Sequence, residues 1–159
     1  VDVETTAELA AAVESAVPSC DVLLMAAAVA DFRAADPSAG KLAREEGREL
    51  ELRLTETEDV LAAVARERRA GQTLIGFAAE HGPEAIARAR RKLQEKGVDA
   101  IVFNDISRSD IGFDSPQNEV TIVDRDGERA VPRASKEDVA DAILDRVDEL
   151  RSSVHSESA

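Results

Sequence analysis

The sequence predicts one α/β domain, a Rossmann-like parallel sheet flanked by helices with an antiparallel hairpin at one edge. Three observations lead to this fold class. Apolar strand-like segments alternate with helix-like segments, which is typical of right-handed βαβ crossovers. Near the C-terminus, two short strand-like segments flank Asp126-Gly127, a dipeptide that favours a tight hairpin turn. The 159 residues, 43% hydrophobic but only 3% aromatic, suit a single core of aliphatic side chains.

The first elements follow from periodicity. Apolar residues at helical spacing predict a helix over residues 4–16, with Thr5 or Thr6 at its start. The continuous apolar run DVLLMAAA, residues 21–28, predicts a parallel strand covered on both faces. After a long polar loop, the alternating leucines of ELELRLT, residues 49–55, predict a half-buried strand.

The alternation continues to the end of the domain. It predicts a helix over 58–69, a strand over 73–78, a helix over 83–96 ended by Gly97, a strand over 99–105, a hairpin of 118–124 with 128–133, and a helix over 135–150. In the last helix, Ser135 is the expected N-cap and Asp138 occupies the third helical position. The domain therefore spans residues 1–150, and residues 151–159, which lack periodicity, are expected to form a disordered tail.

Composition excludes several classes of function. A net charge of −13 argues against nucleic-acid binding, because affinity for phosphates comes largely from basic groups. The longest apolar run, residues 22–30, is far below the roughly 20 residues of a membrane span. Together with the lack of a visible signal peptide, this predicts a soluble, cytoplasmic protein. The single Cys20 excludes an internal disulfide and is expected to be a bystander thiol.

Small, polar or acidic residues follow three of the predicted strands, in AAAVAD (26–31), GFAAE (76–80) and FNDIS (103–107). Ligands of open parallel sheets bind beyond these carboxyl ends, so we interpret the three segments as one ligand platform. Alanines let a ligand approach the backbone closely. Polar side chains for ribose hydroxyls or a metal ion would come from Asp31, Glu80, Asn104 and Asp105.

Each of these features also has a purely structural interpretation. The alanines fit close helix packing, Asp31 and Asp105 fit helix N-caps, Glu80 fits a solvated loop, and Phe77 fits a core aromatic.

The basic residues are equally open to two interpretations. Lys92 and Lys96, four apart on one helical face, either bind phosphates or form a solvated helix end. His81 is either a general base or, more simply, a surface residue.

Several linked motifs resemble phosphopantothenoylcysteine synthetase, the CTP-dependent phosphopantothenate–cysteine ligase of coenzyme A biosynthesis. They are AAAVADFRAA, Lys41 in GKLAREE, GFAAE, and FNDIS followed by IGFDSPQNEVTIV, in matching order over residues 1–150. The resemblance implies a ligase that uses CTP and Mg²⁺ to join 4′-phosphopantothenate to L-cysteine. An acyl-cytidylate would form with release of pyrophosphate, and the cysteine amine would then displace CMP.

The resemblance also implies site residues. Lys41 matches the family's flexible-loop lysine, although only Arg44 survives of the other loop cations, and Asn104 belongs to a site-lining Asn-Asp pair; both are candidate catalytic residues. The implied CTP contacts are Met25, Ala26, Ala27, Asp31, Lys41, Glu58, Asp59, Val60, Leu61, Phe77, Lys92 and Lys96.

Family members carry an upstream first strand and a Gly/Ser-rich turn that this chain does not show, so we expect an N-terminally truncated domain, inactive alone. The resemblance further implies a homodimer, with the edge hairpin of residues 118–133 as a candidate interface, and fusion to or assembly with a phosphopantothenoylcysteine decarboxylase. Two alternatives stay open. One is a Rossmann-type oxidoreductase or methyltransferase, against which the absent G-x-G-x-x-G counts, and the other is a non-catalytic nucleotide-binding or dimerisation module.

Overall fold

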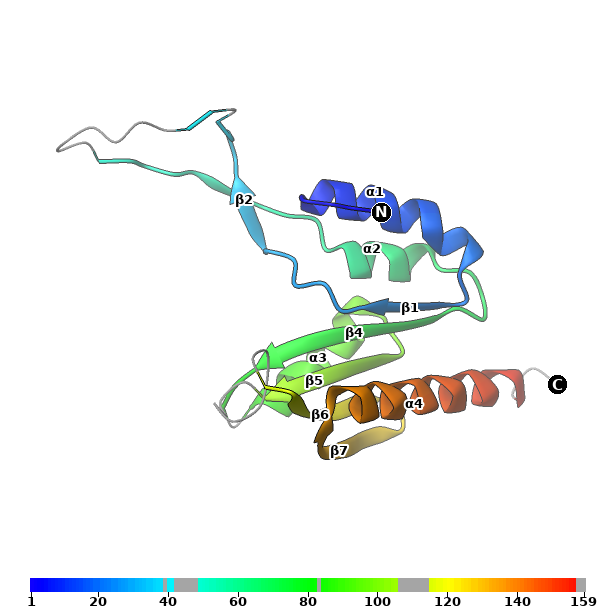
Figure 1. Ribbon diagram of the computed structural model, residues 1–159. Coiled ribbons are helices and arrows are strands. Elements are labelled where there is room, and N and C mark those ends of the chain that lie inside the picture. The colour runs from blue at the N-terminus through cyan, green and yellow to red at the C-terminus, as the bar shows by residue number, and fades with distance from the viewer. Residues whose placement is uncertain (39, 42–48, 83, 106–114, 157–159) are drawn as a thin grey trace.

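A computed structural model describes residues 1–38, 40–41, 49–82, 84–105 and 115–156, and the side chains up to residue 153. Figure 1 shows the arrangement of its elements. The helices are α1 (Thr6–Ala16), the short 3₁₀ turn η1 (Val17–Ser19), α2 (Val60–Glu67), α3 (Ala85–Lys96) and α4 (Lys136–Ser156). The strands are β1 (Val22–Met25), β2 (Phe32–Ala34), β3 (Leu54–Glu56), β4 (Thr73–Glu80), β5 (Ala100–Asp105), β6 (Gln117–Asp124) and β7 (Gly127–Ser135).

The main sheet has the strand order β1-β4-β5-β6-β7. β1, β4 and β5 are parallel, in a register that places Val22 beside Thr73 and Ile75 beside Ala100. β6 and β7 are antiparallel and form the edge hairpin. The predicted fold class, a Rossmann-like sheet with an antiparallel edge, is therefore confirmed.

Helices cover both faces of this sheet and define two cores. On one face, β-strand side chains such as Leu74 and Ile101 pack against α1, α2 and α3. On the other face, Ile75 and Val102 pack against α4. β4 and β5 are buried on both faces because their side chains alternate between these two cores.

The helix ends form where local chemistry predicted them. Thr5 caps α1 through a capping box in which Glu8 reaches back to the Thr5 backbone N–H. Gly97 ends α3 in the left-handed region, at φ 66°. The Ser135 hydroxyl accepts from the Asp138 backbone N–H at 3.0 Å, which confirms this cap of α4.

The end of α4 was predicted wrongly. The helix continues to Ser156, so most of the expected tail, residues 151–156, is helical, and residues 157–159 lie outside the described part of the chain. Tertiary contacts hold this extension. Arg151 donates to the Asp21 carbonyl at 3.0 Å, and Arg125 donates to the Ser153 hydroxyl at 2.9 Å.

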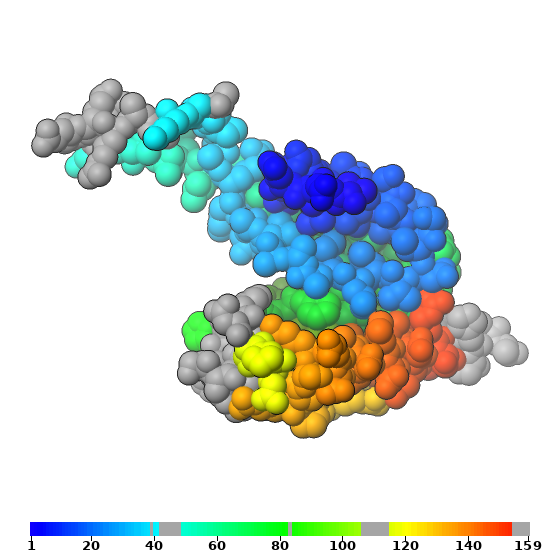
Figure 2. Space-filling view, in the orientation of Figure 1, coloured from blue at the N-terminus to red at the C-terminus, as the bar shows by residue number. Residues whose placement is uncertain are grey.

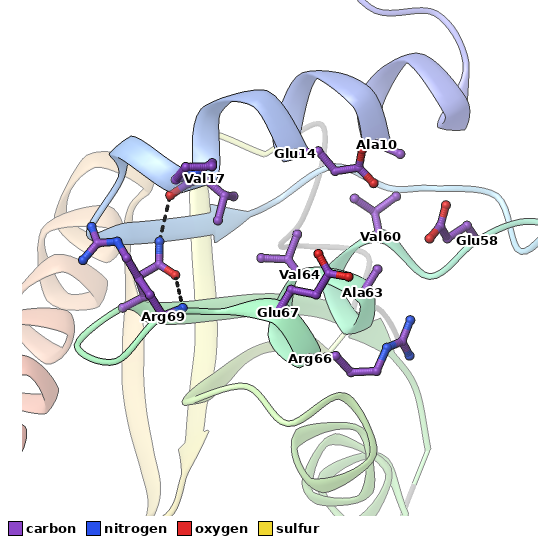
Figure 3. A pocket seen from close by; sticks show the side chains of 12 residues that line it. Ala10, Glu14, Val17, Glu58, Val60, Ala63, Val64, Arg66, Glu67 and Arg69 are labelled. Atoms are coloured by element: carbon purple, nitrogen blue, oxygen red, sulfur yellow. Dashed lines mark hydrogen bonds between the residues drawn. The ribbon is translucent and has the colours of Figure 1, made fainter.

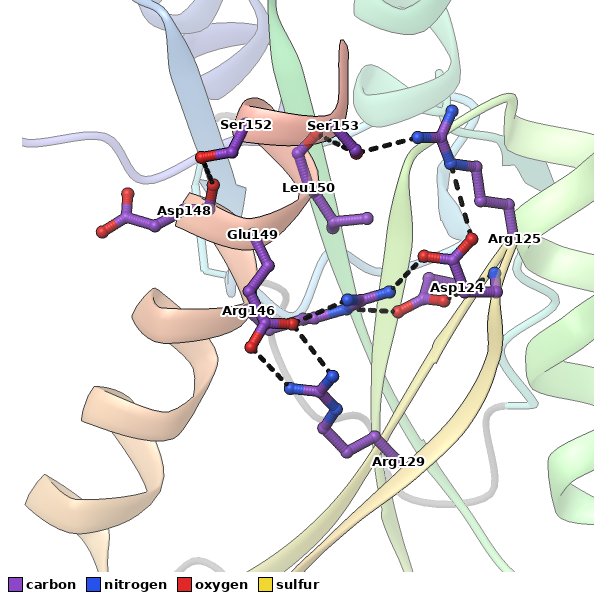
Figure 4. A network of polar contacts seen from close by, with 10 residues as sticks. Asp124, Arg125, Arg129, Arg146, Asp148, Glu149, Leu150, Ser152 and Ser153 are labelled. Atoms are coloured by element: carbon purple, nitrogen blue, oxygen red, sulfur yellow. Dashed lines mark hydrogen bonds and ion pairs between the residues drawn. The ribbon is translucent and has the colours of Figure 1, made fainter. Parts of the chain in front are cut away.

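A polar network ties α4 to the tip of the β6–β7 hairpin (Figure 4). Arg146, whose side chain is only 10% exposed, donates to Asp124 at 2.8 Å, Asp126 at 2.7 Å and Glu149 at 2.8 Å. These three acceptors, with Asp124 foremost, raise the pKa of Arg146 above its ordinary value. Hydrogen bonds from Arg129, first, and Arg146 lower the pKa of Glu149 from 4.5 to about 2.

β2 and β3 form a separate two-stranded antiparallel ladder that projects from the body of the molecule (Figures 1 and 2). We call β2, β3 and the described residues between them the arm. The prediction of a half-buried strand over 49–55 is wrong. Only residues 54–56 form a strand, and Leu50, Leu52 and Leu54 are 57%, 63% and 61% exposed. The alternating leucines correctly indicated an extended segment. The three-residue strand β2 is too short to bury their side chains.

No described helix is long and apolar enough to cross a membrane.

Candidate functional site

A cavity of about 710 Å³ lies at the carboxyl ends of β1 and β4, on the sheet face that carries α2 and α3. We call it the lysine cavity. Of the residues predicted to contact CTP, it brings together Met25, Ala27, Asp31, Glu58, Asp59, Val60, Leu61, Phe77, Lys92 and Lys96. These residues come from β1, the loop after β1, the start of α2, β4 and α3, so the fold assembles them from segments far apart in the sequence.

The two lysines of α3 each contact a carboxylate from a different element. Lys92 Nζ lies 2.6 Å from Glu80 Oε1 at the end of β4. Lys96 Nζ lies 2.5 Å from Asp59 Oδ2 at the start of α2. Both lysines line the cavity and pair with carboxylates, so neither is a freely solvated helix end, and phosphate binding by them stays a prediction.

Glu80 also forms an ion pair with Arg88, whose Nε lies 2.7 Å from Glu80 Oε2. Hydrogen bonds from Lys92, first, and from Arg88 lower the pKa of Glu80, against the raising effect of burial. The Glu80 side chain is 17% exposed, so the interpretation as a solvated loop residue is also wrong. Sequence reasoning missed the Glu80–Arg88 contact, although Arg88 and Lys92 are four apart on one helix and so predict a common face.

Asp59 has two structural roles. Its Oδ1 accepts from the Ala62 backbone N–H at 3.1 Å and caps α2, while its Oδ2 holds Lys96. Burial raises the pKa of Asp59, but the hydrogen bonds from Lys96 and from the Ala62 N–H lower it further than burial raises it. The carboxylate therefore stays ionised beside Lys96 at neutral pH.

The loop after β1 also lines the lysine cavity. The Asp31 carbonyl accepts from the Thr57 backbone N–H at 2.9 Å, and the Thr57 hydroxyl donates to the Ala30 carbonyl. These bonds fix the loop to the segment before α2 and place Asp31 at the cavity rather than at a helix start, so the N-cap interpretation of Asp31 is wrong. Phe77 is 41% exposed and lines the cavity, which excludes the core interpretation.

Two predicted residues lie in a different cavity, of about 450 Å³, on the α4 face of the sheet. They are Ala26 and Asn104, and we call this space the asparagine cavity because Asn118 also lines it. The two cavities share wall residues at the strand ends, namely Ala27, Ala28, Phe77, Ala78 and Ala79. They therefore adjoin across the carboxyl edge of the sheet.

Lys41 is not brought to either cavity. It is exposed, on the arm, and Arg44 lies outside the described residues. The prediction that the loop of Lys41 closes over reacting groups stays a prediction.

Two further candidates, Asp105 and His81, line neither cavity. Asp105 is the last residue of β5 rather than a cap within a described helix. His81 is exposed, and its backbone carbonyl accepts from Arg88.

No cluster of three or more His, Cys, Asp or Glu side chains in the described part of the chain is arranged to hold a metal ion. Carboxylates of Asp31 and Glu58 do line the lysine cavity. Such a pair suits Mg²⁺ that arrives with a triphosphate, since this ion commonly uses one or two protein carboxylates together with phosphate oxygens.

A third hollow, of about 510 Å³, lies between α1 and α2 (Figure 3). Gln72 closes one end by donating to the Val17 carbonyl at 2.7 Å and accepting from the Arg69 backbone N–H at 2.9 Å. Glu14 and Glu67 face this groove, and Glu58 and Val60, two of the predicted CTP contacts, line it as well as the lysine cavity.

Comparisons with known proteins agree with the fold class. Residues 1–150 match the family model described as DNA/pantothenate metabolism flavoprotein C-terminal domain. The chain is 34% identical over 149 residues to the coenzyme A biosynthesis bifunctional protein CoaBC of Escherichia coli strain K12, covering 92% of this chain and 36% of that protein. It is 38% identical over 125 residues to a cysteine/cysteine sulfinic acid decarboxylase from an unknown prokaryotic organism, covering 79% of this chain and 34% of that protein.

The solved structures include the crystal structure of the C-terminal domain of CoaBC. It is similar with a TM-score of 0.73 and 30% sequence identity, over 94% of this chain and 64% of that chain. The chain spans about a third of the length of the curated relatives that it matches, between 34% and 36% for these two proteins.

Proposed function

Because the chain belongs to the DNA/pantothenate metabolism flavoprotein C-terminal domain family, we propose that it is the ligase domain that joins 4′-phosphopantothenate to L-cysteine in coenzyme A biosynthesis, consuming CTP. The observation that carries the proposal is the lysine cavity, where Lys92 and Lys96 converge on one ligand-sized space at the strand ends. The cavity has two cations and four acidic lining residues, Asp31, Glu56, Glu58 and Asp59, a combination that suits a nucleoside triphosphate bound together with Mg²⁺ rather than a bare polyanion.

The reaction has two steps. A carboxylate oxygen of 4′-phosphopantothenate attacks the α-phosphorus of CTP, the bond to the β-phosphate breaks, and pyrophosphate leaves. The cysteine amine then attacks the acyl carbon, the amide bond forms with loss of a proton, and CMP leaves. An anion attacks an anion in the first step, so positive charge at the transition state is the main requirement.

Residues of the lysine cavity would supply this positive charge and position the nucleotide. Lys92 and Lys96 bind phosphate oxygens, and Glu80 and Asp59 hold the two ammonium groups at the wall. Bound Mg²⁺ neutralises triphosphate charge, and Asp31 and Glu58 would hold it. Backbone at Met25 and Ala27 and the exposed ring of Phe77 would contact the nucleoside.

We further propose that the protein is a homodimer and that a decarboxylase domain accompanies it; one relative is named a bifunctional protein and another a decarboxylase. Two surfaces compete for the dimer interface. The outer edge of β7 carries Pro132 and charged side chains, which protect strand edges against pairing. The arm instead exposes Phe32 (54%) and three leucines, so it is the better candidate.

The nucleotide assignment is tested by calorimetric titration of the chain with CTP, ATP, NAD and S-adenosylmethionine, each with and without Mg²⁺. We expect CTP with Mg²⁺ to bind most tightly, and Lys92→Ala and Lys96→Ala each to weaken it about tenfold or more, since a charged hydrogen bond contributes about 1.5–3 kcal/mol. Arg90→Ala is the matched control, because Arg90 lies on the same helix, pairs with Glu128 and lines neither cavity. Binding of NAD but not of CTP would contradict the proposal.

A further inference from the structure

A cavity of about 500 Å³ lies at the amino edge of the sheet, opposite the edge that carries the lysine cavity. Thr73, the first residue of β4, belongs to its lining. We call it the arginine cavity, because its charged lining residues are Arg68, Arg69, Asp99, Arg125 and Arg151. Four guanidinium groups and one carboxylate therefore line a ligand-sized space in a chain whose net charge is −13.

The fold brings these arginines together from three separate segments. Arg68 and Arg69 lie in the connection between α2 and β4, and Arg151 lies on α4. Arg125 follows β6, which is antiparallel to β5, so the end of β6 lies beside the start of β5 at the amino edge. Figure 4 shows Arg125 bonded to Ser153 of α4. No local sequence pattern predicts this cluster.

Structural contacts account for part of the cluster. Arg68 Nη1 lies 2.5 Å from Asp99 Oδ2, and Arg69 Nη2 lies 2.9 Å from Asp21 Oδ1. Arg69 Nη2 also donates to the Cys20 carbonyl at 3.0 Å. Within the described residues, these bonds use one nitrogen of each guanidinium. Because a guanidinium carries five N–H donors, at least three on Arg68 and three on Arg69 have no acceptor in that part of the chain.

The charge of Arg125 is balanced less well. Its Nη2 donates to the Ser153 hydroxyl, a neutral group, at 2.9 Å. Its Nε lies 3.8 Å from Asp126 Oδ1, which is beyond hydrogen-bond distance. Asp126 instead pairs closely with Arg146, at 2.7 Å. An anion in the arginine cavity would therefore supply a counter-charge that the nearby carboxylate does not.

Phosphate groups suit this lining. The planar guanidinium fork binds two phosphate oxygens at once, a geometry that a lysine ammonium does not offer. Linked phosphates carry several negative charges along one chain, so a single molecule can contact several of the arginines. The one acidic lining residue, Asp99, is already paired with Arg68. The lysine cavity differs, because its four acidic lining residues call for Mg²⁺ with the phosphates.

We propose that the arginine cavity binds a chain of linked phosphate groups without a metal ion. Free polyphosphates and nucleotides both carry this chemistry. The inference is independent of the proposed ligase function, because the arginine cavity and the lysine cavity share no lining residue. The two sites have opposite metal dependence. Added Mg²⁺ weakens binding in the arginine cavity, since the ion neutralises the phosphate charge that the arginines attract.

The test titrates the chain, with labelled methyl groups, with tripolyphosphate in a buffer that contains EDTA, and follows it by NMR. We expect shifts of the methyl signals of Leu93, Val98 and Leu150, which line the arginine cavity. The methyl signals of Val60 and Leu61, which line the lysine cavity, should stay in place without Mg²⁺. No binding, or shifts confined to Val60 and Leu61, would overturn the inference.

Two variants and a matched control sharpen the test. Arg125→Gln and Arg69→Gln should each weaken tripolyphosphate binding about tenfold, because each removes a charged donor. Both side chains are about half exposed, so both variants should stay folded, which circular dichroism checks. Arg90→Gln should bind like the unaltered chain, since Arg90 is equally exposed and pairs with Glu128 but does not line the arginine cavity. Unchanged affinity of folded Arg125→Gln, or equal loss in Arg90→Gln, would overturn the inference.

Parallel titrations in EDTA identify the source of the phosphates. Tighter binding of ATP than of tripolyphosphate, at the same methyl groups, would assign the site to nucleotides, and equal or weaker binding would assign it to the phosphate chain alone. Inorganic phosphate should bind about tenfold more weakly than tripolyphosphate, because it contacts fewer arginines. Equal affinity for inorganic phosphate would overturn the assignment to linked phosphates. Failure of CTP with Mg²⁺ to bind the lysine cavity would refute the proposed function and leave this inference standing.

Discussion

Single carboxylates in this protein are shared between cations. Glu149 contacts both Arg129, at 2.9 Å, and Arg146, at 2.8 Å, and Glu80 contacts both Lys92 and Arg88. The sequence predicted part of the site at this scale, because the spacing of Lys92 and Lys96 put both on one face of a helix. The acids that hold these lysines were not predicted in that role. Their proximity depends on how α3 packs against β4 and α2, which no local pattern specifies.

Glu149 makes stability depend on pH in a defined direction. Its pKa falls from 4.5 to about 2 on folding, so its stabilising effect is fully present above pH 4.5 and is lost as the pH falls towards 2. We expect Glu149→Gln to lower the urea midpoint at pH 7 and the difference from the unaltered chain to shrink between pH 4.5 and 2.

Asp145→Asn, an exposed position on the same helix, is the matched control for this pH series. It should change the urea midpoint little at any pH. A Glu149→Gln deficit of the same size at pH 7 and pH 2.5 would show that the ion pairs do not cause it.

Helices that have both a helical spacing of apolar residues and a capping residue were predicted well. Helices α1, α3 and α4 begin or end at Thr5, Gly97 and Ser135, as capping chemistry indicated. The failures, the exposed arm and the last turns of α4, share one cause. Whether Leu52 is buried depends on which element packs against it, and the local sequence does not specify that element. Arg151 contacts Asp21, which is 130 residues away in the sequence, only because the fold brings the two together.

The contact between β4 and α2 depends on one glycine. A Cβ at Gly76 would lie 2.7 Å from Leu61 Cδ2 and 2.9 Å from Ile101 Cδ1, closer than carbon atoms pack. We expect Gly76→Ala to destabilise the fold by about 1–3 kcal/mol in urea unfolding, as overpacked cores do. CTP binding should weaken as well, because Leu61 lines the lysine cavity.

Gly40→Ala provides the comparison for Gly76→Ala. A Cβ at Gly40 meets no atom within 4 Å, so this substitution should leave the unfolding free energy nearly unchanged. Equal stability of both variants would mean that α2 moves away from β4 without cost.

At the scale of the whole molecule, the arm exposes apolar side chains that a single chain leaves uncovered. Leucines that are 57% to 63% exposed on a projecting ladder are a liability in water unless another surface covers them. We expect the chain to sediment as the proposed dimer, and the double variant Leu52→Glu and Leu54→Glu to sediment as a monomer. Burial of these side chains in a dimer is the physical reason.

Ala130→Arg, on the exposed part of β7, tests the edge hairpin in the same experiment. It should leave the dimer intact if the arm forms the interface. Dissociation by Ala130→Arg, with the arm variant still dimeric, would instead assign the interface to the hairpin predicted from the sequence.

The double duty of Asp59 has a thermodynamic consequence. One oxygen of this carboxylate fixes the first turn of α2 and the other restrains Lys96, so a triphosphate that attracts Lys96 frees the carboxylate for its helix. Occupancy of the lysine cavity and the local opening of α2 are then linked equilibria. We expect the exchange with deuterium of the Ala62 and Ala63 amide protons, bonded to the side chain and the carbonyl of Asp59, to slow on addition of CTP with Mg²⁺.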